Sequence, residues 1–322
     1  MRYLVTLAPL EPFLFGGDNT FGKVGDKENG TYLVSSRQFP QQSAVLGMLK
    51  KEIMTQSGVL TRKVRGEWVD RYHKKEAGDL VGVEKFDIRS SELQNFGAIT
   101  SLGAVFLMQE DERYIKKVDI DSYSYSYNDG LLKDYNPKKD IYDNFVNINS
   151  DEKLSSKDIF KAIEQTGNKT GGEDNSLFKK TSYTLKHNFK FAFYLECDYE
   201  LKNSIISLGA DGSKFKLEIK ESDKTLYYQD KNGYLTLLSD AYITLPIKEH
   251  CEFAITSEIS FQSLQNQKHA TKTNEFKKSK KIFLYEKGSV FIKPSEELLK
   301  NLQNKNCQQV GYNQHTYKGQ EK

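Results

Sequence analysis

Residues 189–198 read Phe-Lys-Phe-Ala-Phe-Tyr-Leu-Glu-Cys-Asp, and this stretch decides the class of fold. Apolar side chains recur at every second position from Phe189 to Cys197, and charged or amphipathic side chains fill most positions between them. A period of two residues is the repeat of a β-strand, whose side chains point alternately to opposite faces. The stretch therefore predicts an antiparallel strand with one buried face. It also places Cys197 in the core, away from any reactive site.

Similar short segments lie on both sides of this strand. We expect strands at residues 3–7, 101–108, 214–219, 234–238, 241–245, 251–257, 281–285 and 289–293. The dipeptide Lys287-Gly288 predicts a tight hairpin between the last two. The tetrapeptide Ser-Leu-Gly-Ala occurs at 101–104 and again at 207–210, each time beside strand-like sequence, which suggests two related α+β halves.

Three segments predict helices. A proline-led helix begins at Pro40 and places Val45, Met48, Leu49 and Ile53 on one face. A second helix is expected at Lys157–Thr166, within a polar segment, and a third begins after Ser295, which suits the N-cap position.

Composition excludes several classes of protein. A chain of 322 residues is long enough for about two domains. Its 47 Lys and Arg against 44 Asp and Glu give a net charge of +3, which excludes a uniformly basic nucleic-acid coat. The three cysteines form no CxxC pair, so neither a zinc ribbon nor a disulfide scaffold is predicted. Because no apolar run approaches the ~18 residues that cross a bilayer, we expect a cytoplasmic chain with no membrane partner.

No group of residues predicts a catalytic centre. The five histidines include no helical metal pair and no HExxH motif, and no GxSxG element is present. The sequence therefore predicts no catalytic residue, no metal ligand and no cofactor.

Positive charge is the clearest local signal. Residues 268–293 contain eight Lys and two Glu, and a cluster lies just before a predicted strand, at Lys277, Lys278, Lys280 and Lys281. This cluster could bind a polyanion, and binding would be driven by the release of counterions. The ordinary alternative is that the lysines form a solvated surface with no ligand.

The start of the first helix offers a second candidate for anion binding. Gln41, Gln42 and Ser43 occupy its first turn, where free backbone N–H groups and the helix dipole can hold a phosphate. The alternative is that they are ordinary polar residues of a helix N-terminus. Lys50, which flanks the apolar face of the same helix, is a further candidate RNA contact.

Three segments, in order, resemble the Cas5-like RAMP subunits of type III-B CRISPR effectors, which form the third subunit of the Cmr complex. Residues 10–17 read Leu-Glu-Pro-Phe-Leu-Phe-Gly-Gly and are followed by Phe21-Gly22. Residues 39–49 read Phe-Pro-Gln-Gln-Ser-Ala-Val-Leu-Gly-Met-Leu, in which Gly47 is expected to permit close packing. Residues 283–291 read Phe-Leu-Tyr-Glu-Lys-Gly-Ser-Val-Phe and precede a helix and a loop at 310–319.

The resemblance implies a fold of two RRM-like (ferredoxin-like) βαββαβ halves with inserted hairpins and helices. Residues 1–182 would form the first half, with insertions at about 59–90 and 110–180. Residues 183–322 would form the second half.

The resemblance also implies a non-catalytic, RNA-binding structural subunit in antiviral defence. Such a subunit holds the 5′ repeat-derived tag of the CRISPR RNA and contacts the large cyclase/polymerase-type subunit and the first backbone RAMP subunit. The resemblance nominates two groups of residues as RNA contacts. The first group is Arg37, Gln41, Gln42 and Ser43, and the second, in the final loop, is Gly311, Tyr312, Asn313, His315 and Lys318.

Two other hypotheses stay open. A RAMP-type, metal-independent endoribonuclease that processes CRISPR precursor RNA would use His315, with Tyr317 and Lys318, for acid–base chemistry. A protein-interaction module that binds no RNA would use the segment at 110–180 as its binding element.

Overall fold

The structure is a computed structural model of the whole chain. It describes all residues except 17–18, 22–31, 61–62, 65–66, 69–73, 127–130, 134–135, 137–139, 151, 169–176, 263, 267–275 and 318–322.

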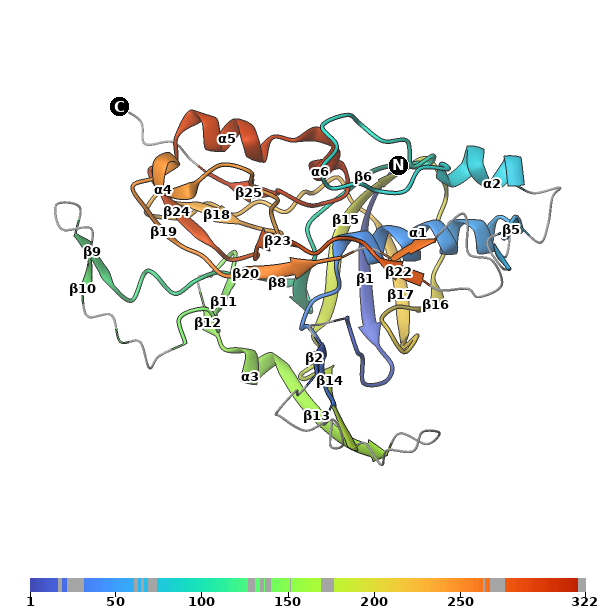
Figure 1. Cartoon of the computed structure of the whole chain (residues 1–322), viewed down its shortest axis with the longest axis horizontal. Coiled ribbons are helices and arrows are strands. Elements are labelled where there is room, and N and C mark those ends of the chain that lie inside the picture. The colour runs from blue at the N-terminus through green and yellow to red at the C-terminus, as the bar shows by residue number, and fades with distance from the viewer. Residues whose placement is uncertain are drawn as a thin grey trace.

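A nine-stranded sheet forms the centre of the molecule, with the first strand of the chain in its interior (Figure 1). Strand β1 (Arg2–Pro9) pairs antiparallel with β15 (Lys190–Cys197) on one side and with β17 (Lys214–Glu221) on the other. The order along the sheet is β12-β11-β8-β7-β15-β1-β17-β16, and β6 (Ile99–Leu102) pairs with β15 beside this path. The remaining members are β7 (Phe106–Gln109), β8 (Glu112–Lys116), β11 (Phe145–Asn147), β12 (Lys153–Leu154) and β16 (Ser204–Ser207).

The predicted strand at 189–198 is confirmed as β15. Phe191, Phe193 and Cys197 are fully buried, as the period of two requires. Ala192 on the opposite face is buried as well, because a second apolar cluster that includes Phe106 and Tyr228 covers that face. At Ala192, β15 is therefore buried on both of its faces. The alternation of apolar and polar side chains in the sequence predicted only one buried face.

Helix α1 (Gln42–Gln56) covers the first face of this sheet. Val45, Leu49 and Ile53 are fully buried in the same apolar cluster as residues of β1 and β15, so the predicted helix and its inner face are confirmed. The expectation that Gly47 permits close packing is wrong. Gly47 is exposed, and an added Cβ would meet no heavy atom within 4 Å.

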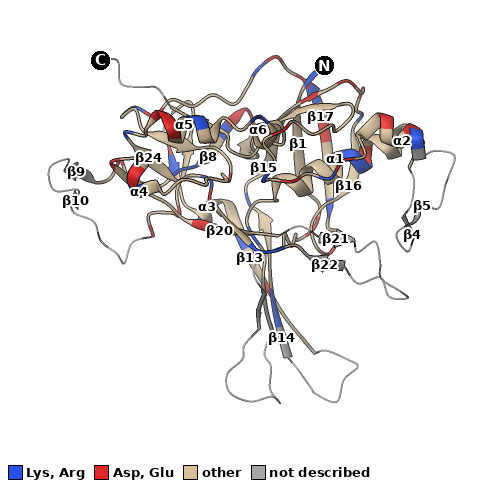
Figure 2. Cartoon of the chain, turned by 45° about the horizontal axis from the view of Figure 1, so that its top comes forward, with Lys and Arg blue, Asp and Glu red and all other residues tan. Residues whose placement is uncertain are grey.

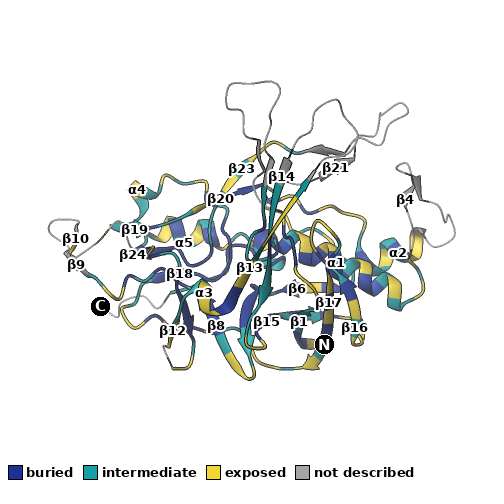
Figure 3. Ribbon diagram, turned by 90° about the horizontal axis from the view of Figure 1, so that it is seen from below, coloured by how far each residue is buried: buried dark blue, intermediate teal, exposed yellow. Residues whose placement is uncertain are grey.

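The predicted helix at Lys157–Thr166 is wrong. Only α3 (Ser156–Ile159) is helical, and the chain then forms β13 (Phe160–Asn168), which pairs with β14 (Leu177–Leu185) in an antiparallel hairpin. β14 also pairs parallel with β3 (Tyr32–Ser35), which pairs with β2 (Asn19–Phe21). These ladder hydrogen bonds override a weak local helix preference. The hairpin projects from the body of the molecule (Figures 1 and 3).

Part of the segment expected to be an insertion at 110–180 belongs to the central sheet. β8 and β11 pair with one another, and their residues Tyr114, Ile115, Phe145 and Val146 are buried. Outside the sheet, β9 (Ser124–Ser126) and β10 (Leu131–Lys133) form a separate ribbon.

A second, smaller sheet has the order β19-β24-β18-β25. Its strands are β19 (Phe253–Ile255), β24 (Val290–Ile292), β18 (Leu235–Leu237) and β25 (His315–Thr316), all paired antiparallel. The helices of this region are α4 (Ile247–His250), α5 (Glu296–Leu302) and α6 (Lys305–Gln309). The predicted cap of α5 is confirmed, since the Ser295 hydroxyl accepts the Leu298 N–H at 3.2 Å.

The predicted hairpin at Lys287-Gly288 is wrong. β23 (Ile282–Tyr285) pairs with β20 (Glu258–Phe261), whereas β24 pairs with β18 and β19. The chain passes from one sheet to the other at Gly288, whose φ is 87°. The strand expected at 241–245 is also absent from these described residues, where Ala241 makes a single bridge to Tyr285.

The architecture confirms a mixed α+β chain in which most strand pairs are antiparallel. The central sheet takes strands from both sides of the expected boundary at 182/183, because β15 and β17 flank β1. Within the described part of the chain, no helix is both long enough and apolar enough to cross a membrane.

Candidate nucleic-acid interface

The loop after α6 is packed into the interior of the molecule. The side chain of Tyr312 is fully buried, with its ring stacked on Phe86 at 5.4 Å and edge-on to Phe261 at 6.0 Å between centroids. Its hydroxyl accepts the backbone N–H of Ser43 at 3.2 Å and lies 3.3 Å from the Ser43 hydroxyl. Burial raises the pKa of the Tyr312 phenol, so the ring is neutral in the folded protein. A ring in this position presents no face to a nucleobase.

Gly311 and Gln42 hold the same loop against the start of α1. The Gln42 Nε2 donates to the carbonyl oxygens of Gly103 at 2.9 Å and Gly311 at 2.8 Å. Gly311 has a φ of 82°, and a Cβ added there would lie 2.2 Å from the Gln42 Nε2. Only glycine fits this backbone conformation and this close approach.

Asn313 ties the loop to the second sheet. Its Oδ1 accepts the Tyr242 N–H at 2.8 Å, and its own N–H donates to the Asp240 carbonyl at 3.1 Å. We call Gly311, Tyr312 and Asn313, with Gln42 and Ser43, the C-terminal latch. Because Tyr312 occupies the N–H of Ser43, that donor of the helix N-terminus is not free for a phosphate.

Arg37 and Gln41 line a pocket of about 170 Å³ beside this latch. The Arg37 guanidinium donates to the carbonyl oxygen of Ser260 and, at 3.1 Å, to its hydroxyl. Arg37 is partly exposed. Its side chain contacts Ser260 in the two-stranded ribbon of β20 and β23, and it also lines the pocket.

Lys287 lines the same pocket and was missed by sequence reasoning. Its ammonium donates to the Val105 carbonyl at 3.2 Å and lies 4.0 Å from the centre of the Phe39 ring. Burial lowers its pKa to about 8, against the opposing attraction of Asp240 and Glu286. A lysine in a basic segment is usually taken for a surface residue, and no signal in the sequence distinguished this one.

Lys50 is held against the body of the molecule. Its ammonium donates to the Glu84 carbonyl at 3.1 Å and lies 4.7 Å from the centre of the Phe96 ring. Burial lowers the pKa of Lys50 to about 8. Its position therefore serves packing between α1 and the segment after α2 (Lys74–Val81).

The basic segment at 268–293 is divided between different environments. Lys280 and Lys281 are exposed next to β23, and the Lys281 ammonium lies 5.3 Å from the centre of the Phe283 ring, which is 57% exposed. Lys293 pairs with Glu252 at 3.0 Å, and Lys287 is buried. Figure 2 shows Lys and Arg interspersed with Asp and Glu over the described elements.

Two other lysines of the cluster lie in β22 (Phe276–Lys278), which pairs with β21 (Leu264–Asn266). The side chains of Lys277 and Lys278 are outside the described part of the structure, as is Lys318.

His315 lies in β25 and is partly buried. Its Nδ1 is 3.0 Å from the Asn313 carbonyl oxygen, and burial lowers the pKa of the imidazole. Across the described residues, no group of three or more His, Cys, Asp and Glu side chains is arranged to hold a metal ion.

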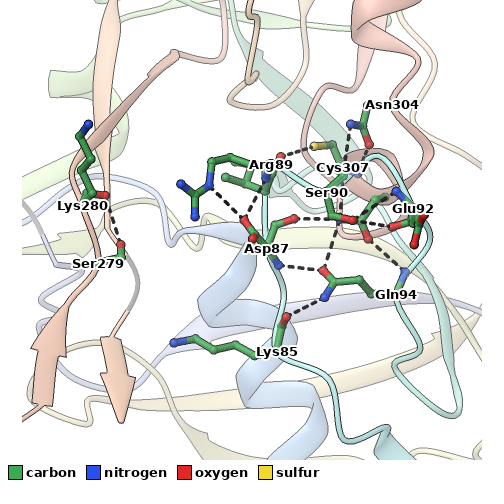
Figure 4. Close-up of polar contacts among 12 residues, drawn as sticks. Lys85, Asp87, Arg89, Ser90, Glu92, Gln94, Ser279, Lys280, Asn304 and Cys307 are labelled. Carbon is green, nitrogen blue, oxygen red and sulfur yellow. Dashed lines mark hydrogen bonds and ion pairs between the residues drawn. The ribbon is translucent and has the colours of Figure 1, made fainter. Parts of the chain in front are cut away.

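The segment that follows α2 is fixed to the C-terminal helices (Figure 4). The Asn304 Nδ2 donates to the Ser90 carbonyl at 3.2 Å, and the Cys307 thiol donates to the Ile88 carbonyl at 3.3 Å. Ile88 and Phe86 are buried in the main core. The last part of the expected insertion at 59–90 is therefore packed as core, and Phe86 supplies the stacking partner of the latch.

Comparison with known proteins identifies this architecture. A chain of the cryo-EM structure of type III-B Cmr-beta bound to cognate target RNA and AMPPnP is similar, with a TM-score of 0.53, 15% identity, and coverage of 98% of this chain and 96% of that one. A chain of Cmr-beta bound to cognate target RNA gives a TM-score of 0.54 with the same identity and coverage. The chain has the fold of a Cmr complex subunit. The resemblance inferred from the sequence is thereby confirmed at the level of the fold.

This Cmr-like fold is reached with a divergent sequence. No protein-family model matches the chain, and no curated protein matches it either.

Proposed function

We propose that this chain is an RNA-binding structural subunit of a type III-B CRISPR complex. The observation that carries the proposal is the likeness to Cmr-beta chains over 98% of this chain and 96% of theirs. In the proposed role it occupies the Cas5-like position, holds the 5′ repeat-derived tag of the CRISPR RNA, and contacts the large cyclase/polymerase-type subunit and the first backbone RAMP subunit.

The order of strands supports two ferredoxin-like units within this fold. In the second sheet, β18, α4, β19, β24, α5 and β25 occur in this order along the chain, with β20 to β23 inserted between β19 and β24 and α6 between α5 and β25. The strands lie in the order β25-β18-β24-β19. That is the antiparallel arrangement of a βαββαβ unit, in which the fourth strand pairs with the first. The first unit would use β1, α1, β6, β15 and β17, in the order β17-β1-β15-β6.

The two units differ in completeness and in where they begin. Residues 198–213, between β15 and β17, contain β16 and no helix. The strand order favours Leu235 as the start of the second unit. A division at 182/183 remains a prediction, and we propose the later boundary as the better one to test.

The exposed groups around β20 and β23 are the better part of the proposed RNA surface. Arg37, Lys280 and Lys281 bring positive charge to this ribbon, and Phe283 adds an exposed ring. Phosphate contacts by Lys and Arg combined with stacking on aromatic rings are the usual means of holding a single strand. Gln41 stays a candidate beside Arg37, whereas Gln42, Ser43, Gly311, Tyr312 and Asn313 would act through the latch.

A structural role, and not cleavage of RNA, is proposed for His315. A general base and a general acid must each reach the reacting atoms of the RNA, directly or through one water. His315 Nδ1 instead faces a backbone carbonyl, and Tyr317 packs against the apolar cluster of the second sheet. Metal-independent cleavage of precursor RNA by the purified chain, abolished in His315→Ala, would overturn this assignment.

Affinity purification from the native host tests the proposed function. RNA sequencing and mass spectrometry of the purified assembly should recover short RNAs that share one repeat-derived 5′ end, together with a large cyclase-like subunit and a backbone subunit. Recovery of the chain without RNA would contradict the proposal. Recovery of proteins alone would favour an interaction module.

A further inference from the structure

A pocket of about 400 Å³ opens where the two sheets meet. Lys305, Gln308 and Gln309 of α6 line one side, and Gln314 and His315 line the other, next to β6. This volume lies within the range of small-molecule and cofactor sites. The pocket near Arg37 is smaller, at about 170 Å³.

The charge of this pocket distinguishes it from the other cavities. None of its described lining residues carries a carboxylate, and Lys305 supplies a cation at its edge. The Arg37 pocket contains Asp240 and Glu286, and a cavity of about 530 Å³ near the N-terminus contains Asp111, Glu221 and Asp223. Lys305 is exposed, and it forms no ion pair within the described part of the chain. The other two pockets also hold cations beside their carboxylates, namely Arg37 and Lys287 in one and Arg2, Arg113, Lys220 and Lys224 in the other. This pocket is therefore the one of the three that combines a cation with no carboxylate.

Hydrogen bonding fixes the protonation of His315. The Nδ1 faces a carbonyl oxygen, which can only accept, so Nδ1 carries the proton. Burial lowers the pKa of the ring, so the imidazole is neutral at neutral pH. In a neutral ring with a protonated Nδ1, Nε2 is an acceptor.

Two glutamines of the pocket have different roles. The Gln314 amide is fully used, because its Oε1 accepts the Ala104 N–H at 2.7 Å and its Nε2 donates to the Leu102 carbonyl at 3.2 Å. The Gln309 Oε1 is buried and has no hydrogen-bond partner among the described residues. A buried acceptor without a donor costs about 1–3 kcal/mol, which a ligand donor would offset. The pocket thus combines a cation with two acceptors that lack a donor.

We propose that this pocket binds one nucleotide of single-stranded RNA whose base carries an exocyclic amino group. The phosphate would pair with Lys305, and the amino group would donate to Gln309 or His315. Adenine, cytosine and guanine carry such a group and uracil does not. The proposal rests on the proposed RNA-binding function and adds to it a base preference and a place.

Cytosine and uracil oligomers provide matched probes, since the two bases have the same size and differ in an amino against a keto group. The full chain, or its assembly freed of bound RNA, is titrated with fluorescein-labelled oligo(C) and oligo(U) of eight nucleotides. We expect oligo(C) to bind about 3- to 10-fold more tightly than oligo(U). At least one of the variants His315→Phe and Gln309→Leu should reduce this ratio, and a thermal unfolding curve shows whether each variant is folded.

Lys305→Ala tests the phosphate contact with no risk to the core, because the side chain is exposed. It should weaken both oligomers equally and lower the slope of log affinity against log salt by about 0.7. Lys300→Ala, an exposed lysine on the neighbouring helix α5, is the matched control and should leave the slope unchanged.

Equal affinity for oligo(C) and oligo(U), or a Lys305→Ala slope equal to that of Lys300→Ala, would overturn this inference. Either result leaves the proposed function standing if the native assembly still retains its RNA. Absence of RNA from that assembly would instead contradict the proposed function itself.

Discussion

The C-terminal latch and the ribbon of β20 and β23 differ in how they meet solvent, although the sequence nominated residues in or beside both of them as RNA contacts. In the latch, Gly311, Tyr312 and Asn313 are buried and hydrogen-bonded to the start of α1 and to the second sheet. In the ribbon, Lys281 and Phe283 are exposed. The difference indicates that the latch joins the two sheets and that the ribbon is available to a ligand. Substitutions in the latch should therefore affect stability, and substitutions in the ribbon should affect RNA affinity.

Tyr312→Ala should have the largest effect on stability. It removes a fully buried ring that packs against Phe86 and Phe261. We expect the free energy of unfolding in urea to fall by about 3–5 kcal/mol. Tyr312→Phe keeps the ring and removes the hydroxyl that accepts from Ser43, so it should cost about 1 kcal/mol. A decrease in the alanine variant smaller than that in Tyr312→Phe would show that the latch does not join the sheets.

Gly311→Ala should come next, at about 2–4 kcal/mol, because it combines a left-handed backbone with overlap against Gln42 and two carbonyl oxygens. Gly58→Ala is the matched control, since Gly58 has a φ of 77° and open space around an added Cβ. It should cost about 1 kcal/mol. Equal decreases in the free energy of unfolding would mean that close packing at Gly311 contributes nothing.

Lys287→Met tests the lowered pKa of the buried Lys287, which lies between the C-terminal latch and the ribbon of β20 and β23. Because its folded pKa of about 8 lies below its usual value, the folded state binds fewer protons than the unfolded state between about pH 8 and 10.5. Stability should rise with pH across that window, and the destabilisation is fully present below it. The wild type should gain roughly 1–3 kcal/mol from pH 8 to 10 relative to Lys287→Met. Parallel profiles of the two proteins would disprove a lowered pKa for Lys287.

The smallest effect on stability is expected for charge reversal of the lysine cluster that lies in β22 and just before β23. Replacement of Lys277, Lys278, Lys280 and Lys281 by Glu should change the free energy of unfolding by about 0.5 kcal/mol or less per site. It should lower RNA affinity and reduce its salt slope by about 0.7 for each phosphate that is no longer neutralised. An unchanged salt slope in fluorescence titration would exclude this lysine cluster as the RNA surface.

The sequence predicted correctly those elements whose pattern of apolar side chains is contained within the element itself. β15 and α1 carry uninterrupted periods of two and of 3.6 residues, and both form as predicted. The hairpin of β13 and β14 was missed because its pairing with β3 joins segments about 150 residues apart, and local propensity carries no information on such pairing. The connection at Gly288 was misassigned for the same reason, since β23 and β24 find their partners elsewhere in the chain.

The sequence predicted which segments meet at the candidate site, but it did not predict which of their side chains are buried and which are exposed. Arg37 and Gln41 do meet in one pocket, and the final loop does reach α1. The sequence did not indicate that Lys287 is buried or that Tyr312 faces inward, because both depend on the meeting of two sheets. Positions rich in lysine and tyrosine fit a nucleic-acid surface equally well, so composition could not separate the latch from the ribbon.

The place of β1 in the sheet has a consequence for synthesis on the ribosome. Residues 2–9 are made before their neighbours in the sheet, residues 190–197 and 214–221. At translation rates of about 5–20 residues per second, those partners are made roughly 10–40 seconds later. Both edges of the first strand lack their native partners for that time, and unpaired edges are prone to join the wrong chain. Strand β1 therefore does not have both of its native neighbours until residue 221 has been made.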